Sequence, residues 1–266
     1  MNVHTQTHLR SMRAMRGFTL VELMVTVAIA MFLLFGLTTI VQNVRQTNLN
    51  QQALAQLQDQ QRFALTVITD VVQNGGYFPD ATLYSASSLP LIGNFVQGQA
   101  FYSPPGAAYY PGVGDTLSVR YLTGNDKFGN NDGVMLCDGS TNTAQLPFHV
   151  YTNVLSVLQA VPPAIGGLYC QVDNLGASAA APGVLIVPGV VSMKVYYGVK
   201  RDNALTDYNT DTYLTAAGML PADWTAISSV RVVLWFTNPL AGQPGQPATI
   251  VFERVIEVMG RGGVHT

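Results

Sequence analysis

Three glutamates, four histidines and two cysteines are the residues of this chain best suited to acid–base, metal or thiol chemistry. Glu253 and Glu257 lie four positions apart in a run rich in β-branched residues. On a strand they would share one face at a separation of about 13 Å. That separation is too large for either geometry of glycoside hydrolysis. We therefore predict that they form the exposed side of an amphipathic strand.

His149 is the one histidine in the body of the chain, because His4 and His8 lie in a basic leader and His265 is next to last. No nucleophile or acid is placed beside it by the sequence, so a structural role is expected. The sequence also contains no phosphate-binding glycine loop and no zinc-ligand spacing. These patterns predict a protein that is not an enzyme and that needs no cofactor.

Asp207, Asn209 and Asp211 alternate in the way that the first ligands of a calcium loop do. The glycine expected at the sixth position and the acid expected at the twelfth are replaced by Thr212 and Gly218. We predict a polar loop without a metal and keep the three residues as weak calcium candidates.

The composition excludes several classes of protein. Charged residues make up 11% of the chain and hydrophobic residues 48%, with a formal net charge of −2. Such a chain can bury a large core, so it is not disordered. Because Arg10, Arg13 and Arg16 precede Gly17, the rest is acidic, which disfavours binding to nucleic acid.

Glu22 lies inside an apolar stretch, residues 18–41, which as a helix would be about 36 Å long and could span a bilayer. Positive charge before the stretch places its N-terminal end in the cytoplasm. A cleaved secretory signal ending near Ala28 and Ala30 is the alternative, although the apolar run continues past it. An acid in such a segment is costly and marks a functional candidate.

Beyond the membrane segment, apolar residues continue at three- and four-residue steps up to Asn74-Gly75-Gly76, where glycine ends the pattern. This predicts one helix from Phe18 to about Gln73, with an amphipathic second half. Its buried stripe would consist of Leu54, Leu57, Ala64, Ile68, Val71 and Val72.

After a connecting region rich in Pro, Gly, Ser and Tyr, short strand-like runs follow to the end of the chain. They cover residues 116–123, 133–137, 148–159, 168–172, 184–187, 190–199, 230–237 and 249–258. The expected fold class is α+β, with one long N-terminal helix packed on an antiparallel β-sheet head.

The run Gly17-Phe18-Thr19-Leu20-Val21-Glu22-Leu23 after a basic leader resembles the processing signal of type IV prepilins and pseudopilins. The resemblance implies that a prepilin peptidase cuts after Gly17 and methylates the new N-terminus at Phe18. It also implies that Glu22 neutralises the N-terminal ammonium of a neighbouring subunit during assembly. Pairing two buried opposite charges costs less than burying either alone.

Several stretches of the head resemble, in order, the PilW group of minor pilins. Gly75 stands where that family usually has alanine. The stretches are Gln61-Arg62-Phe63-Ala64-Leu65, Gly75-Gly76-Tyr77, Gly114-Asp115-Thr116-Leu117-Ser118-Val119-Arg120-Tyr121, Cys137 with Gly167-Leu168-Tyr169-Cys170, Val195-Tyr196-Tyr197-Gly198-Val199, Asp211-Thr212-Tyr213-Leu214 and residues 230–235.

This resemblance implies a minor pilin that helps to initiate type IV pilus assembly and is incorporated at or near the pilus tip, with roles in twitching motility and adhesion. The implied partners are the inner membrane, prepilin peptidase, other minor pilins, the major pilin and a tip adhesin. The expected location is the bacterial inner membrane, single-pass with the N-terminus cytoplasmic and the head periplasmic, and then the extracellular pilus.

The expected organisation has five parts. Residues 1–17 form the leader that is removed, 18–41 the transmembrane half of the helix, and 42–74 its amphipathic half. Residues 75–115 form the connecting region and 116–266 the β-rich head.

Cys137 and Cys170 would face an oxidising compartment in this topology, which favours a disulfide between them. Two buried free thiols or a metal site remain as alternatives.

Two other functions also remain open. A minor pseudopilin of type II secretion would share the processing signal and the helix, and a membrane-anchored envelope enzyme would share only the anchor.

Overall fold

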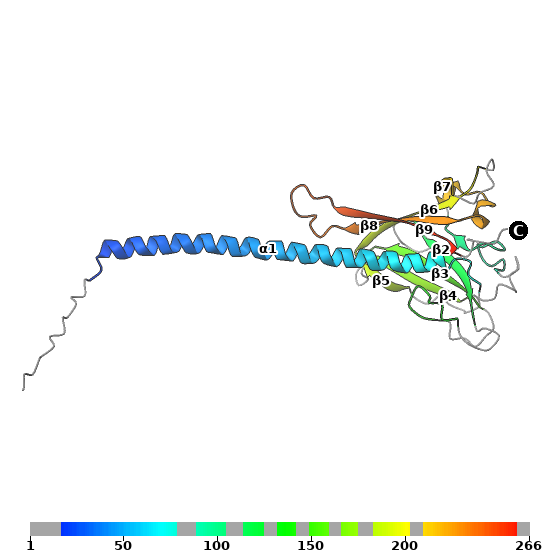
Figure 1. The fold of residues 1–266 in the computed structure, drawn as a ribbon, viewed down its shortest axis with the longest axis horizontal. Coiled ribbons are helices and arrows are strands. Elements are labelled where there is room, and N and C mark those ends of the chain that lie inside the picture. Colours follow the sequence, from blue (N-terminus) through cyan, green and yellow to red (C-terminus); the bar gives the residue numbers. More distant parts are fainter. Residues whose placement is uncertain are drawn as a thin grey trace, which may run out of the picture. The chain divides into compact units, whose positions relative to one another are not determined.

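The computed structural model describes residues 17–78, 89–104, 114–124, 132–141, 149–159, 166–174, 183–202 and 210–259. The chain divides into two compact units, residues 1–52 and residues 53–266. Helix α1 (Leu20–Gln73) begins in the first unit and ends in the second (Figure 1).

The first unit holds the apolar part of α1, whose large hydrophobic side chains are exposed. By length and composition this helix could cross a membrane. The threonines in it do not leave hydroxyl groups without partners: Thr38 and Thr39 donate to the carbonyl of Phe35 at 2.8 and 3.0 Å. The backbone is therefore helical through Gly36 despite the low helix propensity of glycine.

The second unit begins with the amphipathic part of α1. Of the predicted stripe, all members except the half-buried Leu54 are buried, and Leu65 joins them. The helix ends where the sequence predicted, because Gly76 adopts a φ of 77° and the N–H of Tyr77 donates to the carbonyl of Asn74 at 2.8 Å.

The strands form two antiparallel sheets. The first has the order β1-β2-β3-β4-β5, with β1 (Phe101–Tyr102), β2 (Leu117–Thr123), β3 (His149–Leu158), β4 (Gly167–Asn174) and β5 (Val184–Pro188). The second has the order β7-β6-β8-β9, with β6 (Val190–Val199), β7 (Thr212–Leu214), β8 (Ser229–Thr237) and β9 (Thr249–Glu257). Two short 3₁₀ turns, η3 (Ala216–Gly218) and η4 (Asp223–Thr225), lie between β7 and β8.

One core contains the buried stripe of α1 and the inward residues of both sheets, including Leu117, Leu155, Val195 and Val232. β2 is buried along its whole length, which means that both of its faces are covered. β6 alternates between buried and more exposed positions over most of its length, as a strand with one covered face does, whereas β9 is mostly exposed and buries only Ile256.

The predicted class, a long helix with an antiparallel β head, is confirmed, but the strands form two sheets rather than one. The predicted strand at residues 133–137 is wrong, because that segment forms a turn with a single bridge between Met135 and Thr141. Its backbone is bonded by side chains instead: Tyr121 donates to the carbonyl of Met135 and Cys137 donates its N–H to Asn153. The short strands β1 and β7 were not predicted.

Asp115 links the segment before β2 to the second sheet. Its N–H donates to the carbonyl of Met193 at 2.8 Å, and its carboxylate accepts the N–H of Val195 at 2.9 Å. The ammonium of Lys194 lies 3.3 Å from the same carboxylate. Gly114 precedes it with a φ of 101°, and a side chain there would overlap the backbone of Met193.

Candidate functional site

The start of α1 is fixed by a helix cap. Thr19 precedes the first helical residue, and its hydroxyl accepts the N–H of Glu22 at 3.2 Å. Its carbonyl accepts the N–H of Leu23 at 3.2 Å. The spacing Thr-x-x-Glu is that of a capping box, and a threonine cap satisfies one of the free N–H groups of the first turn.

Because the helix begins at Leu20, directly after its cap, Gly17 and Phe18 lie outside the helix. Both residues are exposed, so the peptide bond between them is accessible to an enzyme. The leader residues 1–16 lie outside the described residues.

Glu22 lies in the first turn of α1, where the positive end of the helix dipole favours a carboxylate. It is exposed and is the one charged residue between Gly17 and Val44. Among the described residues, no cation forms an ion pair with it. The apolar first half of α1 thus carries one acid, close to the helix start. No ion-pair partner for that acid is found in the described part of its own chain.

The two cysteines lie side by side in the head. Cys137 and Cys170 form a disulfide with 5.8 Å between their Cα atoms, and both residues are buried. Asn153, on the neighbouring strand β3, accepts the N–H of Cys137 at 2.8 Å. Burial raises the pKa of the nearby Tyr121, whose hydroxyl donates to Met135. The disulfide therefore ties the 132–141 turn to β4, with hydrogen bonds on both sides of it.

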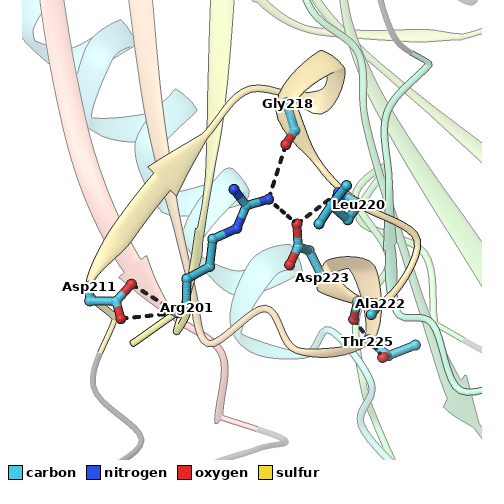
Figure 2. A network of polar contacts seen from close by, with 7 residues as sticks. All are labelled: Arg201, Asp211, Gly218, Leu220, Ala222, Asp223 and Thr225. Carbon is cyan, nitrogen blue, oxygen red and sulfur yellow. Dashed lines mark hydrogen bonds and ion pairs between the residues drawn. The ribbon is translucent and has the colours of Figure 1, made fainter. Parts of the chain in front are cut away.

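Of the three predicted calcium candidates, Asp207 and Asn209 lie outside the described residues. Asp211 is described, and its side chain is exposed. Its carboxylate accepts the N–H of Arg201 with both oxygens (Figure 2). It also accepts the N–H of Asp202 at 2.6 Å. The hydrogen bonds from Asp202 and then Arg201 lower the pKa of Asp211. The described residues contain no group of three or more His, Cys, Asp or Glu arranged for a metal.

Arg201 also anchors the turn that carries η3 and η4. Its guanidinium forms an ion pair with Asp223 at 2.6 Å and donates to the carbonyl of Gly218 at 3.3 Å (Figure 2). Asp223 in turn accepts the N–H of Leu220 at 2.7 Å. Asp211 and Asp223 thus bind backbone N–H groups and hold the segments around Arg201 and Leu220 in place.

The remaining candidates have structural surroundings. Glu253 and Glu257 are both exposed on β9, as predicted, and Glu253 forms an ion pair with Arg231 at 2.7 Å. The ring of His149 is half-buried, with its centroid 5.1 Å from that of Tyr151. Neither arrangement brings a nucleophile and a base together.

The sequence analysis assigned no individual role to two residues, Asp115 and Arg120, which appeared there only within a family motif. Asp115 bridges to the second sheet, and Arg120 is completely buried in β2. The signal that could have identified Arg120 is its place between Val119 and Tyr121 in a strand-like run with no other charged residue. A buried arginine there must find hydrogen-bond acceptors.

Comparison with known proteins gives two family matches. Residues 12–38 match the prokaryotic N-terminal methylation motif, and residues 156–249 match the family described as Type IV Pilus-assembly protein W. The first match contains Gly17, Phe18 and Glu22, and the second runs from the end of β3 to the start of β9. The predicted resemblance to PilW-type minor pilins is confirmed by these matches.

A solved structure, a type IV-like pilin from Thermus thermophilus, is similar to this chain at 15% sequence identity. The similarity covers 77% of this chain and 96% of the other, with a TM-score of 0.40. A comparison with curated proteins found no match.

Proposed function

We propose that this chain, which carries a prepilin methylation motif and a PilW-type head region, is a minor pilin that helps to initiate type IV pilus assembly and enters the pilus at or near its tip. The observation that carries the proposal is the start of α1. An exposed, non-helical Gly17–Phe18 bond is followed at once by the apolar first half of α1, where Glu22 is the single acid between residues 18 and 41. The match to the pilus-assembly family favours the pilus over type II secretion.

In this proposal the apolar half of α1, residues 18–41, holds the precursor in the inner membrane, with the N-terminus cytoplasmic and the head periplasmic. Prepilin peptidase removes residues 1–17 and methylates Phe18. Residues 42–74 continue the helix into the head, residues 75–115 connect, and residues 116–266 form the surface that meets other subunits. The methylation motif supports the processing step.

Assembly then depends on Glu22. The described residues give it no internal partner, and the ammonium created at Phe18 of a neighbouring subunit is a cation of the right charge. A carboxylate left unpaired in a hydrocarbon environment costs several kcal/mol, so a subunit that brings a cation is strongly favoured over one that does not. Other minor pilins, the major pilin and a tip adhesin are the proposed partners.

The test compares Glu22→Gln with wild type in cells that lack the chromosomal copy. Glu253→Gln is the matched control, because it removes an exposed acid from the head instead. We expect Glu22→Gln to be processed and to remain in the membrane while surface pili and twitching fall sharply, and Glu253→Gln to behave as wild type. Mass spectrometry should find the mature chain starting at a methylated Phe18. An unprocessed wild-type chain, or normal piliation after deletion, would overturn the proposal.

A further inference from the structure

Strand β9 forms one edge of the second sheet, because the strand order is β7-β6-β8-β9. It is nine residues long, contains no proline and pairs with β8 in an unbroken antiparallel register. Because β9 has a neighbour on one side only, every second residue directs its backbone N–H and C=O groups away from the sheet. Unpaired backbone groups of this kind are a template for another strand.

The hydrogen bonds at the two ends of the β8–β9 pair show which residues of β9 point outward. The N–H of Val258 donates to the carbonyl of Ser228 at 2.9 Å, and the N–H of Asn238 donates to that of Ala248 at 3.0 Å. Because hydrogen-bonded pairs alternate in an antiparallel ladder, the even-numbered residues of β9 face β8. The central residues that face outward, called here the open edge, are Val251, Glu253, Val255 and Glu257.

The opposite edge of the same sheet is closed by the protein itself. β7 pairs with the end of β6, from Tyr197 to Val199. Asp115 occupies the outward groups of β6 that precede them: its N–H donates to the carbonyl of Met193, and its carboxylate accepts the N–H of Val195. In the described part of the chain, no residue does the same for β9, and all four residues of the open edge are exposed. A backbone that continues the ladder is therefore the group that this edge lacks.

The side chains of the open edge alternate between apolar and acidic. Val251 and Val255 are 50% and 54% exposed. Glu253 already forms an ion pair with Arg231 of β8 at 2.7 Å, whereas no cation among the described residues forms an ion pair with Glu257. The edge thus offers two apolar positions and one unneutralised carboxylate to an arriving strand.

The same acids disfavour a second copy of this chain as the occupant. Antiparallel pairing of two β9 strands along their whole length would place Glu253 against Glu253 and Thr249 against Glu257. Like charges directly opposite each other on paired strands are destabilising. Arg254 does not compensate, because its side chain lies on the other face of β9 and donates to Thr69 of α1 at 3.1 Å. The charges therefore act against self-association and favour a strand with a positive charge.

We propose that the open edge binds an extended segment of another protein, which adds to the second sheet as an antiparallel strand and carries a basic residue opposite Glu257. Backbone pairing supplies the affinity, and apolar side chains of the segment contact Val251 and Val255. This mode of recognition, in which a peptide extends an existing sheet, is β-augmentation. The inference uses only the geometry and charge of β9, so it goes beyond the proposed function and does not depend on it.

The probe is a capped, fluorescent heptapeptide, Lys-Thr-Val-Thr-Gln-Thr-Val. In the antiparallel register its lysine lies against Glu257, its valines against Val255 and Val251, and its glutamine against the already paired Glu253. Fluorescence anisotropy with the detergent-solubilised full chain measures its binding. The control peptide is N-methylated at the first valine and at the glutamine, the residues whose N–H groups would face β9. Losing two hydrogen bonds should weaken binding about tenfold or more. A peptide with glutamate in place of the lysine should also bind more weakly.

Two substitutions at one position test the protein side. Val255→Pro removes an N–H that faces outward, and Val255→Thr removes the same valine but keeps that N–H. The N–H at position 255 takes no part in pairing with β8, so the sheet should tolerate proline there. We expect Val255→Pro to weaken peptide binding about tenfold and Val255→Thr to change it much less. If Val255→Pro fails to fold, the N-methylated peptide still decides.

Amide hydrogen exchange provides a second measurement. The N–H groups of Val251, Glu253 and Val255 should exchange fast in the free chain and slowly with the peptide bound, whereas those of Phe252 and Arg254 should be slow in both states. No saturable binding by wild type, or equal binding of the N-methylated peptide, overturns the inference. Slow exchange of the open edge in the free chain, or a dimer that Val255→Pro dissociates, shows another occupant and overturns it as well. None of these outcomes bears on processing at Phe18 or on entry into the pilus.

Discussion

The ring of Phe101 fills the space that a side chain at Gly75 would need. A methyl group built on Gly75 would overlap three atoms of that ring. Phe101 is buried on β1, and Gly75 lies directly after the end of α1, so this contact sets how the helix end meets the first sheet. It also explains why glycine stands at a position where PilW-type sequences usually have alanine.

Gly75→Ala should therefore destabilise the protein. The added methyl overpacks the core beside Phe101, which typically costs about 1–3 kcal/mol of unfolding free energy. Urea unfolding of the detergent-solubilised chain measures it. Gly242→Ala is the control, because the space around Gly242 is open and its backbone is not left-handed. Adding Phe101→Leu to Gly75→Ala should recover part of the loss. An unchanged midpoint for Gly75→Ala would contradict the packing argument.

Asp115 is expected to stabilise the link between the sheets mainly as a hydrogen-bond acceptor. Asp115→Ala leaves the N–H of Val195 without its acceptor and should cost about 1–3 kcal/mol in unfolding free energy. Lys194→Met removes only the partly exposed ion pair and should cost less than about 1 kcal/mol. Asp115→Asn keeps an acceptor oxygen and should lie between them. Equal losses for Asp115→Ala and Lys194→Met would show that the ion pair dominates.

Removal of the disulfide should lower stability without changing the fold of the head. The double variant Cys137→Ala, Cys170→Ala is expected to lose about 2–4 kcal/mol, because the bond restricts the unfolded chain. Reduction of the wild type should bring its transition close to that of the variant. Thiol labelling of the unreduced, unfolded wild type should find no reactive cysteine. Two labelled thiols there would contradict the bond.

Acid should weaken the contacts around Arg201. Hydrogen bonds from Asp202 and Arg201 hold the pKa of Asp211 below its ordinary value of 3.8. Burial pushes the pKa of Asp223 upward, but hydrogen bonds from Arg201 and Leu220 outweigh it, and the net shift is also downward. A lowered pKa in the folded state gives stability above the unfolded pKa that is lost as the pH falls through the folded value.

Asp211→Asn should therefore lower the melting temperature at pH 7, and its difference from wild type should shrink as the pH falls below about 4. Thermal melts between pH 7 and pH 3 measure this change. Glu257→Gln, which removes an exposed acid from β9, is the control and should follow wild type throughout. A difference for Asp211→Asn that stays constant over the whole range would exclude this origin.

The helix and its C-terminal end could be predicted because local sequence determines them. The 3.6-residue pattern from Leu57 to Val72 and the glycines after Asn74 act between residues close in sequence. The start was predicted at Phe18, whereas the helix begins at Leu20, after the cap at Thr19. The longer strands could be predicted for a similar reason, since β-branched and aromatic residues are concentrated in them and turn-forming residues separate them. A single short motif also predicted the processing site, and residues 12–38, which contain it, match the prokaryotic N-terminal methylation motif.

The head's internal organisation depends on contacts between residues far apart in the chain. The strands divide into two sheets, and contacts such as that between Asp115 and Val195, eighty positions later, link the first sheet's loops to the second sheet. The segment before Cys137 has a strand-like composition but forms no strand. The hydroxyl of Tyr121 donates to the carbonyl of Met135, and the side chain of Asn153 accepts the N–H of Cys137, so side chains replace the strand partner. β1 and β7 are too short to show a period.

Arg120 illustrates the same division. Its sequence position shows an arginine in a strand, and a strand arginine is usually exposed. Only the folded chain brings the carbonyls of Pro90 and Val96, some 24 to 30 positions earlier, around its guanidinium. Local sequence thus determined the apolar segment, the methylation motif and the class of fold, because the interactions behind them are short in range. The tertiary structure determined the surfaces of the head, because each is built from segments that meet only after folding.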